Sequence, residues 1–107
     1  MLATRDFETG EDFDFQVSFP LPPIQGNDRV QSAKREIHRL IDQGPTSIEL
    51  EFDEIRGVSS DLINFLIWCQ MECNRNRIRL KVNRVDPEIK KVFRFAGLNQ
   101  VLEMEAR

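Results

Sequence analysis

Residues 47–71 read SIELEFDEIRGVSSDLINFLIWCQM, and the change of pattern inside this stretch decides the fold. In its first part apolar and acidic residues alternate, and a period of two is typical of a strand. The apolar residues there are Ile48, Leu50 and Phe52. From Leu62 onward apolar residues recur every three or four positions, which is typical of a helix that packs on one side. The polar sequence Ser59-Ser60-Asp61 lies between the two patterns, so we predict a strand, a short hinge and a helix.

Similar patterns predict further strands and helices on both sides of this unit. The expected elements are a hairpin of Leu2–Glu8 with Phe13–Phe19, a helix from about 27 to Gln43, a strand Ile78–Val82, a helix starting at Pro87 and a last strand Val101–Met104. The last helix is expected to bury Ile89, Val92, Phe93 and Ala96. Strands that alternate with helices indicate a single α/β domain over residues 1–107, with a four- to five-stranded mixed sheet covered by helices. We expect Ile48–Phe52 at the centre of this sheet, because its apolar alternation is the densest.

The composition excludes several classes of function. The chain has 107 residues, of which 31% are charged, and a net charge of −3 without any block of like charges. Nucleic acids and anionic membranes attract basic proteins, so neither is the expected partner. The acidic amino-terminal sequence does not resemble a signal peptide and no stretch is apolar enough for a membrane span, so we expect a cytoplasmic protein without membrane insertion. Cys69 and Cys73 lie four residues apart, and we expect both in the core of a reduced protein.

No motif in the sequence indicates catalysis or a cofactor. There is no glycine-rich phosphate loop, no Ser-His-Asp order and no pair of catalytic carboxylates with a base. A metal bound by Cys69 and Cys73 would need ligands from elsewhere, and His38 has no ligand pattern near it and is expected at the surface. We therefore expect a protein that is not an enzyme and that holds neither a cofactor nor a metal.

The helix predicted after the hinge is apolar on two faces. One face carries Leu62, Leu66, Cys69 and Cys73, and the opposite face carries Asn64, Ile67, Trp68 and Met71. A helix of this kind is either fully buried or part of an interface. Because Trp and Met are enriched at interfaces, we predict that the second face binds a partner. The alternative is that the amino-terminal segment of the chain folds over it.

Two segments resemble a known family. Residues 82–98 read VNRVDPEIKKVFRFAGL and are followed by Val101-Leu102, and residues 59–63 read SSDLI. They resemble the strand, proline-started helix and Gly-Leu ending, and the hinge, of the STAS family of sulphate transporters and anti-sigma-factor antagonists. The resemblance covers roughly Phe13 to the end. The hinge of that family usually reads Asp-Ser-Ser/Thr-Gly-Leu, so Asp61 stands here where the family has its phosphorylated hydroxyl residue.

The resemblance implies a binding module without catalysis of its own. Antagonists of this family bind a serine kinase that doubles as an anti-sigma factor, and phosphate on the hinge separates the pair. The regulatory hinge would then be Ser59, Ser60 and Asp61, with a serine as the phosphoacceptor or Asp61 as a fixed charge that imitates phosphoserine. A plain alternative explains the same residues, with a serine as the helix N-cap and Asp61 as an acid of the first turn.

We therefore expect a regulator that acts by reversible protein–protein binding, as an anti-sigma-factor antagonist or a related partner-switching regulator. A soluble STAS subunit of an ABC-type lipid or anion transport system is one alternative, and a small nucleotide- or lipid-binding domain is another. The expected partner is accordingly an anti-sigma factor with serine kinase activity or the ATPase of a transporter. A homodimer is also compatible with the sequence.

Overall fold

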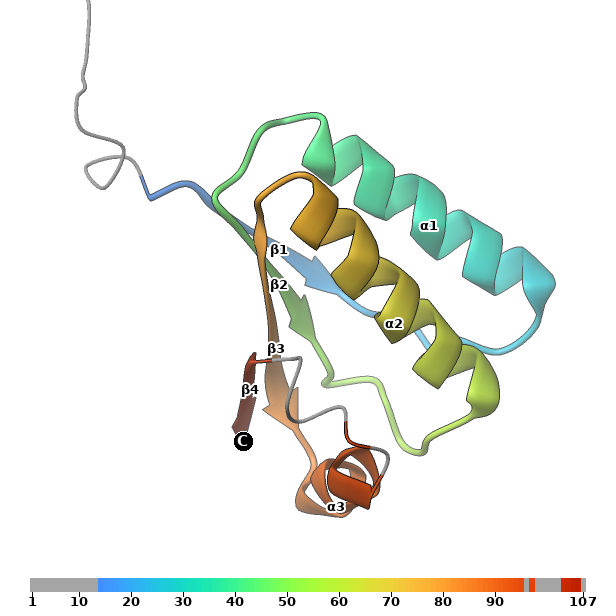
Figure 1. Ribbon diagram of the computed structural model, residues 1–107. Coiled ribbons are helices and arrows are strands. Elements are labelled where there is room, and N and C mark those ends of the chain that lie inside the picture. The colour runs from blue at the N-terminus through green and yellow to red at the C-terminus, as the bar shows by residue number, and fades with distance from the viewer. Residues whose placement is uncertain (1–13, 96, 98–102, 107) are drawn as a thin grey trace, which may run out of the picture.

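Strands and helices alternate along the chain in this computed structural model, which describes residues 14–95, 97 and 103–106 (Figure 1). The elements are β1 (Gln16–Pro20), α1 (Asn27–Ile41), β2 (Ser47–Glu51), α2 (Ser60–Arg75), β3 (Arg79–Val85), α3 (Pro87–Phe95) and β4 (Glu103–Ala106). The α/β class expected from the sequence is thereby confirmed.

The strands form one sheet in the order β1-β2-β3-β4, and every pairing between them is parallel. Three strands, β1 to β3, pair in regular register, and the short β4 joins β3 with a register shift between Val82 and Val85. The regular sheet therefore has fewer strands than the four to five expected, and its described strands are parallel where a mixed sheet was expected. The run Leu2–Glu8, which was expected to supply an antiparallel hairpin strand, lies outside the described residues.

The strand β2 lies inside the sheet between β1 and β3, as its apolar alternation predicted. Its apolar residues Ile48 and Leu50 are fully buried, whereas the intervening Glu49 is partly exposed on the other face. A one-residue shift in register would turn both apolar side chains to solvent, so this alternation fixes the pairing.

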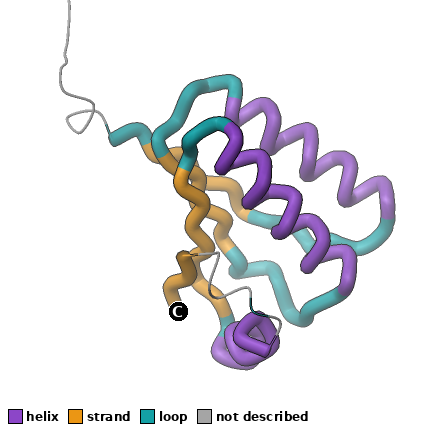
Figure 2. The backbone as a smooth tube through the Cα atoms, in the orientation of Figure 1, coloured by secondary structure: helices purple, strands orange, loops and turns teal. Residues whose placement is uncertain are grey.

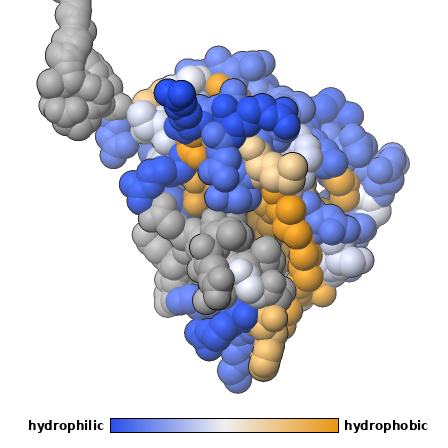
Figure 3. Space-filling model, in the orientation of Figure 1, coloured by the Kyte–Doolittle hydropathy of each residue, from blue (hydrophilic) through white to orange (hydrophobic). Residues whose placement is uncertain are grey.

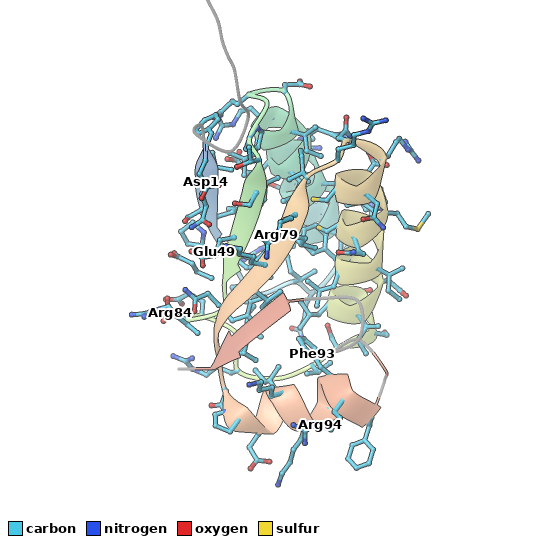
Figure 4. All side chains as sticks on the ribbon, turned by 60° about the vertical axis from the view of Figure 1, so that its left-hand side comes forward. Asp14, Glu49, Arg79, Arg84, Phe93 and Arg94 are labelled. Atoms are coloured by element: carbon cyan, nitrogen blue, oxygen red, sulfur yellow. The ribbon has the colours of Figure 1, made fainter. Side chains whose placement is uncertain are left out.

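Helices α1 and α2 lie side by side on one face of the sheet, and α3 lies at the end where the strands point (Figures 1 and 2). No described helix covers the other face, which carries a polar network centred on Glu49 (Figure 4). The Glu49 carboxylate accepts hydrogen bonds from Gln16 and Ser18, both at 3.5 Å, and from Asn83 at 3.2 Å. These side chains join β1, β2 and β3 on the side of the sheet that faces water.

The core lies between the sheet and the three helices. Fully buried residues come from every layer, among them Ile37 of α1, Leu66 of α2 and Phe93 of α3. The rings of Phe52 and Phe93 meet edge to face, with centroids 6.0 Å apart, and this contact ties α3 to the end of β2. Aromatic pairs of this geometry add about 0.5–1.5 kcal/mol to the gain from burial.

Some boundaries differ from those expected. The strand expected at Phe13–Phe19 is found as β1, which continues one residue further, into Pro20. An edge strand tolerates a proline because it needs few backbone donors, and the next N–H, that of Leu21, still donates to the Glu51 carbonyl at 2.9 Å. The last strand begins at Glu103, and residues 101 and 102 lie outside the described part.

Candidate functional site

The hinge between β2 and α2 contains two serines with different environments. Ser59 is the N-cap of α2: its backbone is extended and its Oγ accepts a hydrogen bond from the Leu62 N–H at 3.1 Å. The same hydroxyl donates to the Ile24 carbonyl at 3.1 Å. The Ser59 hydroxyl is therefore used in two structural hydrogen bonds, as the interpretation of a serine as the helix N-cap predicted.

Ser60 is the first residue of α2 and is exposed to solvent. Within the described ranges its hydroxyl makes no hydrogen bond. Free backbone N–H groups and the positive end of the helix dipole lie at this position, and they stabilise a negative charge. Of the two hinge serines, Ser60 is the one that a modifying enzyme can reach without breaking the helix cap.

Asp61 links the starts of the two long helices. Its Oδ2 accepts a hydrogen bond from the Gly26 N–H at 2.9 Å, across 35 residues of sequence. Gly26 has a φ of 87°, in a region that residues with a side chain rarely adopt, so the backbone freedom of glycine permits the conformation that makes this bond. Asp61 is also only partly exposed, and part of its charge faces the α1 start instead of solvent.

The loop of residues 21–26 is consequently fastened to the hinge at two points. The Ser59 hydroxyl holds the Ile24 carbonyl, and the Asp61 carboxylate holds the Gly26 N–H. A change at the hinge that breaks either bond loosens the connection between β1 and α1. No local pattern in the sequence indicates this coupling, because the paired residues are 35 positions apart.

A pocket of about 290 Å³ opens beside the hinge. It lies at the carboxyl ends of β1 and β2, which is where ligands commonly bind in parallel α/β sheets. Its polar lining includes Ser59 and Arg56, and Arg56 Nη1 already donates to the Asp53 carbonyl at 2.6 Å. The pocket is at the small end of the range for organic ligands.

The outer face of α2 is only partly as expected. Asn64 is exposed, and Ile67 and Met71 are 43% and 58% exposed, so these three residues face solvent together. Trp68 does not join them: its ring is half-buried against α1, with the His38 ring edge-on at 5.2 Å and Lys34 Nζ 5.1 Å from the ring centroid. The expected four-residue face is therefore a three-residue face.

The reason for this correction is the position of α1 beside α2. Trp68 also stacks on Phe65 of its own helix, with centroids 6.1 Å apart. The sequence pattern does not reveal that α1 lies on this side of the helix. Between α1 and α2, His38 Nε2 lies 3.6 Å from Glu72 Oε1. The His38 side chain remains 58% exposed, so its expected surface position is confirmed.

Cys69 and Cys73 are both free and fully buried on the core side of α2, as expected. Burial raises the pKa of the Cys69 thiol well above its usual range. Burial, with the nearby Glu72 carboxylate, raises the pKa of Cys73 to about 11. Since the thiolate is the nucleophile and the metal ligand, neither residue is prepared for chemistry at neutral pH. Among the described residues, no group of three His, Cys, Asp or Glu side chains is placed to hold a metal.

Sequence reasoning missed an exposed apolar surface on α3. Val92 was expected in the core, but it is 41% exposed, because α3 lies at the end of the sheet and turns only Ile89 and Phe93 inward. Phe95 at the end of the helix is 93% exposed. Ala96, also expected in the core, lies outside the described residues.

Comparison with known proteins does not identify a family. No family model matches the chain, and no curated protein matches it. In the described ranges, no helix is both long enough and apolar enough to cross a bilayer.

Proposed function

We propose that this chain is a non-catalytic STAS-like domain that acts by reversible binding of a protein partner, as an anti-sigma-factor antagonist or a related partner-switching regulator. The observation that carries the proposal is the exposed Ser60 at the start of α2, followed on the same helix by an exposed face of Asn64, Ile67 and Met71. A modifiable hydroxyl at the edge of an apolar contact surface is what a charge-controlled interface requires. The resemblance of residues 59–63 and 82–98 to the STAS family supports the same role.

The physical basis of the switch is the charge that phosphorylation brings. A phosphate on Ser60 adds about −1.5 to −2 charges at neutral pH. The free N–H groups of the first turn stabilise this charge in the unbound domain. Beside a bound partner, the same group meets desolvation and any like charge there, and it weakens the complex. Phosphate on Ser59 would have to break the cap and the bond to Ile24, so Ser60 is the proposed acceptor.

Asp61 has a structural role in addition to its negative charge. Its bond to the Gly26 N–H holds the loop that precedes α1 next to the hinge. The single charge of Asp61 is weaker than that of a phosphate and is shared with this bond, so it imitates phosphoserine only in part. We therefore place the switching charge at Ser60 and the positioning role at Asp61.

Site-specific photocrosslinking in the native cell tests the proposal. With p-benzoylphenylalanine in place of Ile67, one protein should be captured, and it should be a serine kinase of the anti-sigma type. The matched control has the same group in place of Ser18, which is exposed on the uncovered face of the sheet. Equal capture from both positions, or capture from position 18 alone, would contradict a partner site on α2. Capture of a transporter ATPase would favour the transport-subunit alternative.

The pocket beside the hinge makes the small-molecule alternative testable. A nucleotide bound there would contact Arg56 and Ser59, and it would raise the melting temperature of the domain. We expect ATP and GTP to leave the melting temperature unchanged. A rise that disappears in Arg56→Ala would replace the proposed function with nucleotide binding.

A further inference from the structure

Helix α3 exposes apolar side chains that its own packing does not use. Ile89 and Phe93 face the core, whereas Val92 and Phe95 are 41% and 93% exposed. Phe95 is the most exposed large apolar residue of the described part of the chain. Neighbouring exposed apolar side chains on a helix are a feature of contact surfaces.

The surroundings of Phe95 are basic on an acidic molecule. The helix carries Lys90, Lys91 and Arg94 against the single acid Glu88, a net charge of 3 − 1 = +2, while the whole chain has a net charge of −3. Lys91 and Arg94 line a hollow of about 300 Å³ together with Phe95. The ion pair of Lys91 with Glu88 is long, at 4.0 Å, and exposed, so it does little to neutralise the surface. Figure 4 shows the Arg94 side chain pointing away from the sheet.

This basic end continues an apolar band. Figure 3 shows apolar surface running along the front of the molecule from α2 toward α3. Among the described residues of these two helices, the exposed large apolar side chains are Ile67 and Met71 on α2 and Val92 and Phe95 on α3. The partner face proposed for α2 is thus extended by a second helix with positive charge.

We propose that this band receives an acidic amphipathic segment of the protein partner. Its apolar side chains would contact Ile67, Met71 and Phe95, and its carboxylates would lie near Lys91 and Arg94. The inference rests on the proposed function and adds the chemistry of the partner to it. Opposite charge around an apolar centre gives orientation and a faster association rate, and it excludes basic partners.

Two other occupants fit the surface less well. A second copy related by a two-fold axis beside α3 would bring α3 against α3 and oppose like charges of Lys91 and Arg94. An anionic membrane is held by clusters of about four to eight cations, whereas α3 offers three cations beside one acid. A protein segment needs only a few carboxylates at fixed positions to pair with the three cations of α3.

The test is an NMR titration of the ¹⁵N-labelled full chain with two synthetic amphipathic peptides. Both peptides have the same leucine stripe, and their flanking residues are glutamate in one and lysine in the other. The glutamate peptide should shift the amides of residues 91–95 and 67–71, and its affinity should fall with salt. Phe95→Ser should weaken it about tenfold or more, which corresponds to about 1.4 kcal/mol. Phe15→Ser is the matched control, because Phe15 is 45% exposed at the opposite ends of the strands, and it should change nothing.

Other results would overturn the inference in distinguishable ways. Equal binding of the lysine peptide would show that the band binds apolar side chains without selecting for acidic partners. Binding to phosphatidylglycerol vesicles without peptide binding would assign the surface to lipid, and a dimer in sedimentation that Phe95→Ser dissociates would assign it to a second copy. If photocrosslinking from position 67 succeeds while the glutamate peptide fails, only the acidic chemistry of the partner is wrong.

Discussion

At the scale of single residues, the hinge assigns different tasks to neighbouring side chains. Ser59 caps α2 and holds the Ile24 carbonyl, Asp61 holds the Gly26 N–H, and Ser60 between them is exposed. The sequence predicted that these residues begin a helix, because polar residues precede a helical apolar period. It did not predict which serine is the cap, since either one satisfies the pattern.

The two serines give a matched pair of variants. Ser59→Ala removes the cap and leaves two backbone groups without their partner, so the free energy of unfolding should fall by about 1–2 kcal/mol. Ser60→Ala should change it by less than about 0.5 kcal/mol, because the side chain is exposed. Urea denaturation monitored by circular dichroism measures both. A larger loss for Ser60→Ala than for Ser59→Ala would reverse the assignment of the cap.

The buried thiols predict a loss of stability at alkaline pH. Burial raises the pKa of Cys73 to about 11, from an ordinary value of 9.0. Above pH 9 the unfolded chain releases this proton while the folded chain retains it, so the free energy of unfolding should fall as the pH rises from 9 toward 11. Cys73→Ala should show a shallower fall over this range than the parent, with the remainder from Cys69 and other groups. Identical slopes in denaturant titrations would show that Cys73 is not buried as described.

At the scale of elements, α2 has three different sides. Its core side was predictable, because the spacing from Leu62 to Cys73 defines one face of a helix. The side that packs against α1 was not predictable, since the sequence does not reveal which helices lie next to each other. Trp68 was therefore expected to face a partner, and it instead lies in the α1–α2 groove beside His38. The same limit applies to α3, where helical spacing predicted Val92 in the core but the position of the helix at the end of the sheet leaves it exposed.

Trp68→Ala should consequently destabilise the fold. The ring is half-buried and contacts Phe65, His38 and Lys34, so we expect a loss of about 1–3 kcal/mol in the free energy of unfolding, less than for a fully buried tryptophan. Met71→Ala on the exposed face is the control and should cost less than about 0.5 kcal/mol. A Trp68→Ala variant as stable as the parent would return Trp68 to the partner face.

The contact between α3 and the sheet gives a second comparison. Phe93 is fully buried against Phe52, so Phe93→Ala should cost about 3–5 kcal/mol. Phe95→Ala, two residues further on, should leave stability within about 0.5 kcal/mol because its ring is in solvent. Thermal and urea unfolding of both variants measure the difference. Equal losses would contradict the orientation of α3.

At the scale of the whole molecule, the parallel sheet divides the surface into regions of different character. Helices α1 and α2 cover one face, the polar network around Glu49 occupies the other, and the loops and α3 gather at the carboxyl ends of the strands (Figure 1). The hinge and the exposed face of α2 lie on one helix, and the basic end of α3 lies at the carboxyl ends of the strands. The α/β class and the central β2 were predictable, because both follow from local period. The positions of these surfaces relative to one another depend on the packing of distant elements, so they were not predictable from the sequence.

The most direct test of the account measures the affinity of the photocrosslinked partner for three forms of the domain by titration calorimetry. We expect Ser60→Glu to weaken binding about tenfold or more, because it introduces charge beside the contact face, while Ser60→Ala should bind as the parent does. Equal affinity of all three forms would contradict a charge-controlled interface at the start of α2.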